Sequence, residues 1–283
     1  MTEVLVLGAT GTTGSRVAAV LAERGVPHRQ ATRTPTGSGH VRFDWNDRAT
    51  QQDALRGVSA IYLIAPIGEA DPVPFVEPFL KEALHQGVRR VVQLSSSALE
   101  EGAPGLGAVH ELVRSTMPEW TVLRPSWFMQ NFTGDHPVAQ GVRDGGIVTA
   151  TGDGRVAFVD AADIAAVAGR ALIDDEPHNA EYILTGPDAL SYRDAAALIS
   201  AQIGRTVRHC PVSADEYAER IAAQGIPADF AAVLAALDVD IRAGSEDRVT
   251  DAVERVTGRP ARSFRTFVAE AFRWPALEHV KSV

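Results

Sequence analysis

Apolar and polar positions follow two rhythms over the first two thirds of the chain. Short apolar runs typical of buried strands alternate with longer segments in which apolar residues recur at helical spacing. The runs that predict strands are Val4–Leu7, His28–Ala31, His40–Phe43, Ala60–Ile64, Arg90–Leu94, Thr121–Leu123 and Glu181–Leu184. The segments that predict helices are Ser15–Arg24, Gln51–Leu55, Phe75–Gln86, Val109–Thr116 and Ala157–Leu172. Strands that alternate with helices predict a doubly wound α/β fold with a parallel sheet.

The pattern changes after Pro187. Ala-rich segments with helical spacing follow one another, and no strand repeat is evident among them. These segments are Ser191–Ile203, Ser213–Gln224, Ala228–Leu237, Ser245–Thr257 and Ser263–Phe272. We therefore predict a smaller, mostly helical C-terminal region that caps one edge of the sheet.

Composition narrows the class of protein. The 283 residues are 45% hydrophobic and 22% charged, which is ordinary for a globular enzyme. The formal net charge is −9 and no basic run occurs, so we expect no nucleic-acid partner. The chain holds one cysteine, Cys210, and scattered histidines, so we expect neither a disulfide nor a metal site.

The apolar pattern and the single cysteine also indicate the cellular compartment. No window of about 18 apolar residues is present, so we expect no membrane span. The strand pattern starts by Glu3 and leaves no room for a signal peptide, and one lone cysteine suits a reducing compartment. We expect a cytoplasmic protein.

The first predicted strand enters the first predicted helix through G-A-T-G-T-T-G, residues 8–14. Glycines at such a junction allow a tight turn, the close approach of a diphosphate to the backbone, and close contact between helix and strand. The helix N-terminus adds free N–H groups and a positive dipole end. We predict that a dinucleotide is bound here by Gly8, Thr10, Gly11, Thr12, Thr13 and Gly14. The alternative is an α/β turn that binds nothing.

The end of the second predicted strand indicates which dinucleotide. An acidic residue there would hold the ribose 2′-hydroxyl of NAD, but the chain reads Q-A-T-R-T, with Arg33 and no carboxylate. A guanidinium suits a 2′-phosphate, so we predict NADPH/NADP⁺; the alternative is a solvated surface arginine. Other cofactor contacts are expected at the carboxyl ends of the next strands, from Asp44, Ala65, Pro66 and Ser95.

These features define the predicted domains. Residues 1–187 are expected to form a Rossmann-type NAD(P)-binding domain, with residues 126–148 contributing to the substrate pocket. Residues 188–283 are expected to form the helical substrate-binding cap.

Many reductases with this kind of loop protonate the developing alkoxide with a Tyr-x-x-x-Lys pair. The four tyrosines of this chain are followed four residues later by Pro66, Gly186, Ala196 and Ile221, so the pair is absent. Either the protein binds NADPH without turning it over, or its substrate needs little help from an acid. An iminium ion is such a substrate, because hydride addition leaves a neutral amine and the remaining task is positioning.

Several motifs, in order along nearly the whole chain, carry a resemblance to a known family. They are F-D-W at Phe43–Trp45, G-A-V-H-E at Gly107–Glu111, L-R-P-S-W-F-M-Q-N-F at Leu123–Phe132, T-G-D-G-R-V-A-F-V-D-A-A-D-I-A at Thr151–Ala165, G-S-E-D-R at Gly244–Arg248 and T-G-R-P-A-R-S-F at Thr257–Phe264. With the G-x-x-G-x-x-G spacing, the chain resembles the NmrA-like branch of atypical short-chain dehydrogenase/reductases. Within that branch it resembles the ergot-alkaloid (festuclavine and agroclavine) dehydrogenases. The resemblance implies NADPH-dependent reduction of a cyclic iminium in an alkaloid-like natural product.

Candidate catalytic residues are His110, Ser96 and Glu111. His110 lies on the helix that in ordinary members of the fold carries the tyrosine and lysine, and it could donate a proton or a hydrogen bond. It could equally be a structural hydrogen-bonder, and Glu111 could be a solvated helix residue. Ser96 belongs to the Ser95–Ser97 run after the fifth strand, where related enzymes have an assisting serine.

Candidate substrate contacts follow the fifth and sixth strands. They are Ser97, Trp127, Phe128, Met129 and Asn131. Aromatic and thioether groups would form an apolar wall against a ring-shaped ligand, although ordinary core packing explains at least one of them equally well. Asp160 and Asp163 are better explained as a helix start than as a site.

Three functions remain open. The first is a C=N reductase acting on a small natural product, and the second is an NADPH-dependent quinone or enone reductase. The third is a redox sensor that binds NADP(H) and catalyses nothing. The sequence does not predict the oligomeric state.

Overall fold

The computed structural model describes residues 3–273, which divide into two compact units. The first unit consists of residues Met1–Phe128, Val159–Pro187 and Val249–Ala261. The second unit consists of residues Met129–Phe158, Asp188–Arg248 and Arg262–Val283. The chain therefore passes between the units five times rather than once.

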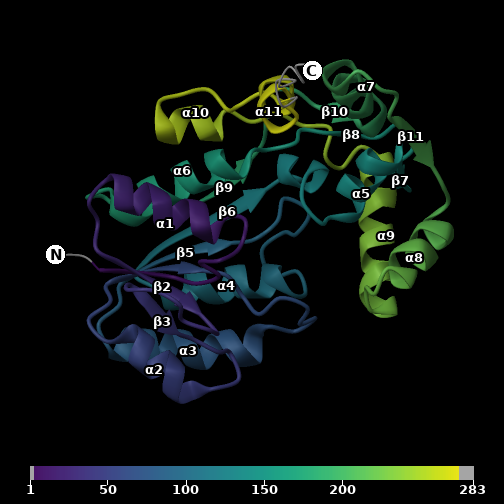
Figure 1. Cartoon of the computed structure of the whole chain (residues 1–283). Coiled ribbons are helices and arrows are strands. Elements are labelled where there is room, and N and C mark those ends of the chain that lie inside the picture. The colour runs from purple at the N-terminus through teal and green to yellow at the C-terminus, as the bar shows by residue number, and fades with distance from the viewer. Residues whose placement is uncertain (1–2, 274–283) are drawn as a thin grey trace, which may run out of the picture. The chain divides into compact units, whose positions relative to one another are not determined.

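A seven-stranded parallel sheet is the centre of the first unit (Figure 1). Its order is β3-β2-β1-β4-β5-β6-β9, so the strand order reverses beside β1, as in dinucleotide-binding sheets. The strands are β1 (Val4–Val6), β2 (His28–Thr32), β3 (His40–Arg42), β4 (Ala60–Leu63), β5 (Arg90–Leu94), β6 (Glu119–Pro125) and β9 (Ala180–Leu184). The predicted Rossmann-type fold is confirmed, and the structure has a strand close to each predicted one.

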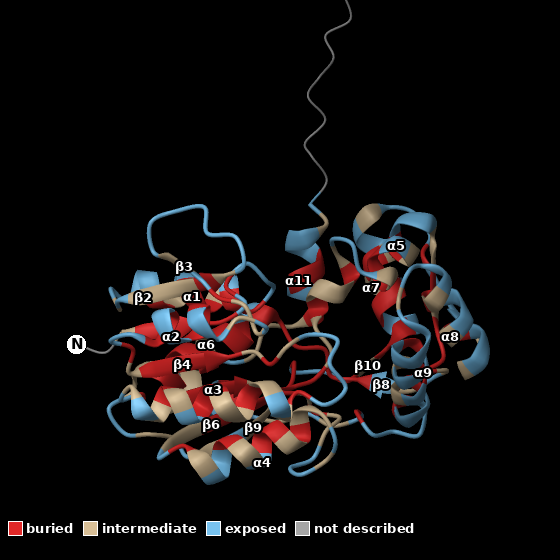
Figure 2. Ribbon diagram, turned by 90° about the horizontal axis from the view of Figure 1, so that it is seen from below, coloured by how far each residue is buried: buried red, intermediate tan, exposed pale blue. Residues whose placement is uncertain are grey.

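Helices cover both faces of this sheet, and side chains alternate between them. Val4 and Val6 pack on the face covered by α1, α6 and α10, while Leu5 and Leu7 pack on the face covered by α2, α3 and α4. Burial on both faces explains why β1 and β4 are continuous apolar runs, and Figure 2 shows β4 buried. The helices are α1 (Gly14–Glu23), α2 (Arg48–Leu55), α3 (Val73–His85), α4 (Leu106–Thr116), α6 (Ala161–Ile173) and α10 (Ala252–Thr257).

The second unit combines helices with two small sheets. Strand β11 pairs in parallel with β7, and β10 pairs antiparallel with β8. Its interior holds aromatic rings that pack edge to face, those of Phe132, Phe158, Tyr192 and Phe264. Its elements are η1 (Met129–Phe132), α5 (Pro137–Asp144), β7 (Gly146–Thr149), β8 (Arg155–Val156), β10 (Leu190–Ser191), α7 (Tyr192–Ile203), β11 (Arg208–Pro211), α8 (Ala214–Ala223), α9 (Ala228–Arg242) and α11 (Phe264–Ala271).

Three expectations about this part of the chain need correction. The C-terminal region contains the strands β10 and β11, which were not predicted. The helix predicted from residue 157 begins only at residue 161, because the Asp160 carboxylate caps it by accepting a hydrogen bond from the Ala162 N–H at 2.8 Å. That observation confirms Asp160 as a helix start. The helix predicted from residue 245 begins only at residue 252.

The single domain boundary after residue 187 also differs from the observed division. Residues 249–261 belong to the first unit because Ala252 and Val253 of α10 are buried in its core. Residues 129–158 belong to the second unit, where β7 pairs with β11. The predicted contribution of residues 126–148 to a substrate pocket stays a prediction.

A buried carboxylate joins two elements of the second unit. Asp238 on α9 is 5% exposed, and its carboxylate accepts a hydrogen bond from the backbone N–H of Ala150 at 2.8 Å. Burial raises the pKa of Asp238 from 3.8 to about 6, against the opposing effect of that hydrogen bond. The folded protein therefore holds a proton between pH 4 and 6 that the unfolded chain releases.

We predict that Asp238→Asn changes how stability depends on pH. With the pKa of Asp238 raised on folding, the wild-type protein loses stability as pH rises from 4 to 6, by at most about 3 kcal/mol from this group. The variant keeps an acceptor for the Ala150 N–H and has no proton to lose. Its free energy of unfolding, relative to that of the wild type, should therefore increase from pH 4 to pH 6. Urea unfolding at pH 4, 5, 6 and 7 measures the difference.

Asp194 provides the control. Hydrogen bonds from Ser191 lower the pKa of Asp194, so Asp194→Asn should alter the pH dependence with the opposite sign. Parallel stability curves for the wild type and Asp238→Asn would contradict the assignment.

Candidate active site

The turn between β1 and α1 is built around two glycines. Gly8 has a φ of +61°, and a Cβ on it would lie 2.8 Å from Cδ1 of Ile64. A Cβ on Gly14 would collide with the carbonyl oxygen of Gly8, so only glycine lets α1 begin this close to the end of β1. The N–H of Gly11 donates to the same carbonyl at 2.9 Å and closes the turn.

This turn fits a diphosphate. Gly8, Thr10, Gly11 and Thr12 are exposed, whereas Thr13 and Gly14 are buried beneath them. The cap residue of α1 is Thr13, whose side chain makes no capping hydrogen bond, and the first turn of the helix holds no acidic residue. The N–H groups and the positive end of the helix dipole are therefore available to an anion.

The other predicted cofactor residues follow successive strands of the same sheet. Arg33, Asp44, Ala65 and Ser95 come after the carboxyl ends of β2, β3, β4 and β5, and Pro66 follows Ala65. Because the strands are parallel, these residues share the edge of the sheet that carries the glycine turn.

The side chains of Arg33 and Asp44 have different contacts. Arg33 is exposed and takes part in none of the ion pairs found within residues 3–273. The Asp44 carboxylate accepts a hydrogen bond from the N–H of Asn46 at 2.9 Å, which stabilises the turn after β3. Asp44 thus has a local structural role, and its predicted contact with the cofactor stays a prediction.

The three serines after β5 have different environments. The Ser95 hydroxyl is buried and has no hydrogen-bond partner within the described part of the chain, which is unusual for a buried polar group. The Ser96 hydroxyl accepts from the N–H of Ala98 at 3.3 Å. Ser97 is buried, and its N–H donates to the carbonyl of Pro125 at 3.0 Å.

The structure places the predicted catalytic histidine against the sheet. His110 on α4 is 1% exposed, its Nδ1 lies 3.7 Å from a carboxylate oxygen of Glu181, and its ring centroid is 6.3 Å from that of Trp120. Burial lowers the pKa of His110, against the opposing effect of Glu181. Its Nδ1 is buried and has no hydrogen-bond partner within residues 3–273, while its neighbour Glu111 is exposed. The catalytic role of His110 and Glu111 stays a prediction.

The predicted substrate residues belong to both units. Trp127 and Phe128 are half-buried in the first unit, where Phe128 packs on the core. Met129 and Asn131 belong to η1 of the second unit. Met129 is fully buried, as core packing would require, and Asn131 is half-buried.

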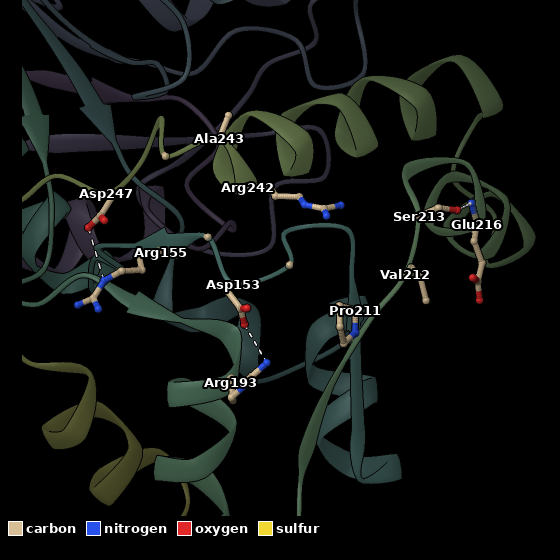
Figure 3. Close-up of a pocket in the computed structure, with 13 residues that line it drawn as sticks. Asp153, Arg155, Arg193, Pro211, Val212, Ser213, Glu216, Arg242, Ala243 and Asp247 are labelled. Atoms are coloured by element: carbon tan, nitrogen blue, oxygen red, sulfur yellow. Dashed lines mark hydrogen bonds and ion pairs between the residues drawn. The ribbon is translucent and has the colours of Figure 1, made fainter.

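The second unit contains a cavity of about 920 Å³ that sequence reasoning missed (Figure 3). Ion pairs between Arg193 and Asp153 at 2.8 Å and between Arg155 and Asp247 at 3.5 Å lie at its wall. Its lining includes Gly152–Arg155, Pro211–Ser213 and Arg242–Gly244. None of the predicted substrate residues lines it. The T-G-D-G-R motif at residues 151–155 and the G-S-E-D-R motif at residues 244–248 supply part of this lining, and they were the signal that the sequence offered.

Residues 3–273 contain no cluster of three or more histidine, cysteine or acidic side chains arranged to hold a metal ion. Within the same residues, no helix has both the length and the apolar character needed to cross a bilayer.

The sheet order and the glycine turn define the class of protein as NAD(P)H-binding α/β. The chain matches the NAD(P)H-binding family over residues 8–175 and the NmrA-like family over residues 107–262. It belongs to the NmrA-like family.

Relatives extend over almost the full chain. The chain is 48% identical to the uncharacterized oxidoreductase YesF of Bacillus subtilis over 269 residues, or 94% of each protein. It is 36% identical to festuclavine synthase I of Penicillium roqueforti, covering 96% of this chain and 99% of the relative. Another relative, (4-alkanoyl-5-oxo-2,5-dihydrofuran-3-yl)methyl phosphate reductase of Streptomyces griseus, is 36% identical over 94% of this chain and 97% of its own length.

A solved structure shares the fold. The NADPH-dependent quinone oxidoreductase QOR2 of Escherichia coli, complexed with NADPH, superposes with a TM-score of 0.82 at 24% identity, covering 96% of this chain and all of that one. The predictions of family, fold, NAD(P)H cofactor and oxidoreductase class are therefore confirmed.

We predict that Arg33→Asp weakens the binding of NADPH more than that of NADH. The exposed guanidinium beyond β2 would pair with the 2′-phosphate, which only NADPH carries, and a carboxylate there would repel it. Dissociation constants for both nucleotides, measured by the fluorescence of the reduced nicotinamide, test this.

Arg24 offers a matched control. It is exposed at the opposite end of α1, so Arg24→Asp makes the same change in net charge away from the glycine turn. Equal losses for both nucleotides in Arg33→Asp, or the same loss of NADPH affinity in Arg24→Asp, would count against the assigned role.

Proposed function

We propose that this protein is an NADPH-dependent reductase that transfers hydride to the C=N bond of an iminium or imine in a small, nitrogen-containing natural product. The resemblance to the clavine dehydrogenases supports this, since the relation to festuclavine synthase I spans nearly the whole of both chains. The C=N substrate goes beyond the oxidoreductase class of the relatives, and the assay below tests it.

The observation that carries the proposal is the make-up of α4. Its buried residues are Gly107, Val109, His110 and Val113, and the whole helix contains neither tyrosine nor lysine. A ketone reduced beside such a helix would develop an alkoxide with no phenolic acid to protonate it. An iminium carbon already carries its activation in the positive charge, and its reduction generates no oxyanion.

The residues of the first unit fit the bound nucleotide. The glycine turn and the N-terminus of α1 would hold the diphosphate, Arg33 the 2′-phosphate, and the Ser95 hydroxyl a ribose or nicotinamide oxygen. When bound, the reduced nicotinamide supplies the hydride. The protein's share of the work is then to bind, orient and exclude water, which can lower the barrier by about 7–11 kcal/mol in favourable cases.

A second candidate is reduction of an activated enone or quinone. The Streptomyces griseus relative is named as a reductase of a (4-alkanoyl-5-oxo-2,5-dihydrofuran-3-yl)methyl phosphate, and its identity to this chain equals that of festuclavine synthase I. Such substrates also need modest help from an acid, so the structure of α4 is compatible with them.

A panel assay is expected to separate these functions. NADPH oxidation would be followed at its near-ultraviolet absorbance with cyclic iminium ions, quinones and enones, with NADH in place of NADPH as the control. We expect turnover with cyclic iminium ions and a preference for NADPH. Turnover of quinones or enones with inert iminium ions would transfer the assignment to the second candidate. Tight NADPH binding with no turnover of any compound would indicate a sensor.

A further inference from the structure

A fully buried arginine holds the loop that follows β5. Arg124, near the end of β6, is 1% exposed, yet it carries a full positive charge. Its NH1 lies 3.0 Å from the Glu181 carboxylate and its NH2 lies 2.8 Å from that of Glu100. A buried guanidinium is tolerated only when its N–H donors have hydrogen-bond partners, so the stability of the fold depends on these contacts.

The remaining donors of Arg124 bind backbone. NH2 donates to the carbonyl of Ser97 at 3.3 Å, and Nε donates to the carbonyl of Ser96 at 3.5 Å. Glu100 lies a few residues further along the same loop. One guanidinium thus holds three points of the segment from residue 96 to residue 100, using the fork of donors that only arginine provides.

Residues 96–100 follow directly after Ser95, whose hydroxyl has no hydrogen-bond partner within residues 3–273. The N–H of Ser95 donates to the carbonyl of Leu123 at 2.7 Å, and Ser97 bonds Pro125, so the residues flanking Arg124 on β6 also bind this run. Ser95 is fixed on one side by β6 and on the other by carbonyls that Arg124 holds. The backbone of Ser95 is therefore held between β6 and the carbonyls that Arg124 binds.

We propose that Arg124 is a positioning residue for catalysis: it holds the Ser95–Ser97 loop so that the buried Ser95 hydroxyl meets the bound nucleotide. The inference rests on the proposed function only for the effect on turnover. Its effect on nucleotide binding needs only the NAD(P)H site of the family.

The chain contains a matched arginine at the opposite edge of the sheet. Arg90 begins β5, its side chain is 12% exposed, and it binds a carboxylate of Glu119 at 2.8 Å. It also donates to the carbonyls of Leu172 and Asp174 at 3.2 and 2.7 Å. Arg90 therefore has the same kind of network as Arg124, placed at the amino ends of the parallel strands and away from the ligand edge.

The experiment compares Arg124→Met with Arg90→Met. Both variants lose a buried network and should lose stability in thermal unfolding. Only Arg124→Met should weaken NADPH binding, by about fivefold to tenfold, as expected for one hydrogen bond. With a substrate found in the panel, it should also lower kcat by about 10- to 100-fold, because the loop no longer fixes the reacting geometry.

A double variant tests whether Arg124 acts through Ser95. Ser95→Ala alone should raise the Kd for NADPH by a similar factor, and Ser95→Ala combined with Arg124→Met should raise it no further. Factors that multiply fully in the double variant would overturn the proposal. So would equal effects of Arg124→Met and Arg90→Met on Kd.

Arg124→Lys keeps the inference testable if Arg124→Met does not fold. Lysine retains the charge but cannot make all four contacts, so the Kd for NADPH should lie between those of the wild type and Ser95→Ala. A Kd equal to that of the wild type would overturn the proposal.

The outcomes separate the two proposals. If the wild type binds NADPH but reduces nothing in the panel, the proposed function fails while the Kd comparisons still decide the role of Arg124. If the wild type does not bind NADPH, both are overturned.

Discussion

The close contact between the start of α1 and the end of β1 is the constraint on which the first unit depends. No side chain separates Gly14 from the carbonyl of Gly8, so helix and strand meet backbone to backbone. This contact sets the height of α1 over the sheet, and from there Val17 and Leu21 enter the core beside α6. It also leaves the first N–H groups of α1 facing the turn, where a diphosphate can accept hydrogen bonds. Packing and cofactor recognition are thus consequences of one pair of glycines.

Much of the first unit could be predicted from the sequence because its signals are local. A strand buried on both faces is usually a continuous apolar run, and such runs mark β1 and β4 clearly. The glycine turn was predictable for a similar reason, since its spacing reflects backbone geometry within seven residues. The strands β8 and β10 are two residues long and pair across a gap of more than thirty residues, so no local periodicity could reveal them.

The candidate site was less predictable, because its residues act through contacts that are distant in sequence. Arg124 was visible only as part of a motif, and its importance comes from Glu100 and Glu181, which flank it far away along the chain. The position of His110 on α4 suggested chemistry, but its burial and the carboxylate of Glu181 at 3.7 Å could be known only from the fold. A sequence names the residue types on an element, but the partner segments decide whether a side chain reaches a ligand or fills the core.

The segments of the two units alternate along the chain, and this order affects folding during translation. Helix α10 supplies Ala252 and Val253 to the core of the first unit, yet the chain reaches it only after most of the second unit has been made. A nascent chain that has emerged as far as β6 therefore exposes an apolar sheet face that its own later segments, α6 and α10, will cover. The first unit cannot reach its final packing on the ribosome ahead of the second, and an isolated N-terminal fragment would be prone to aggregate.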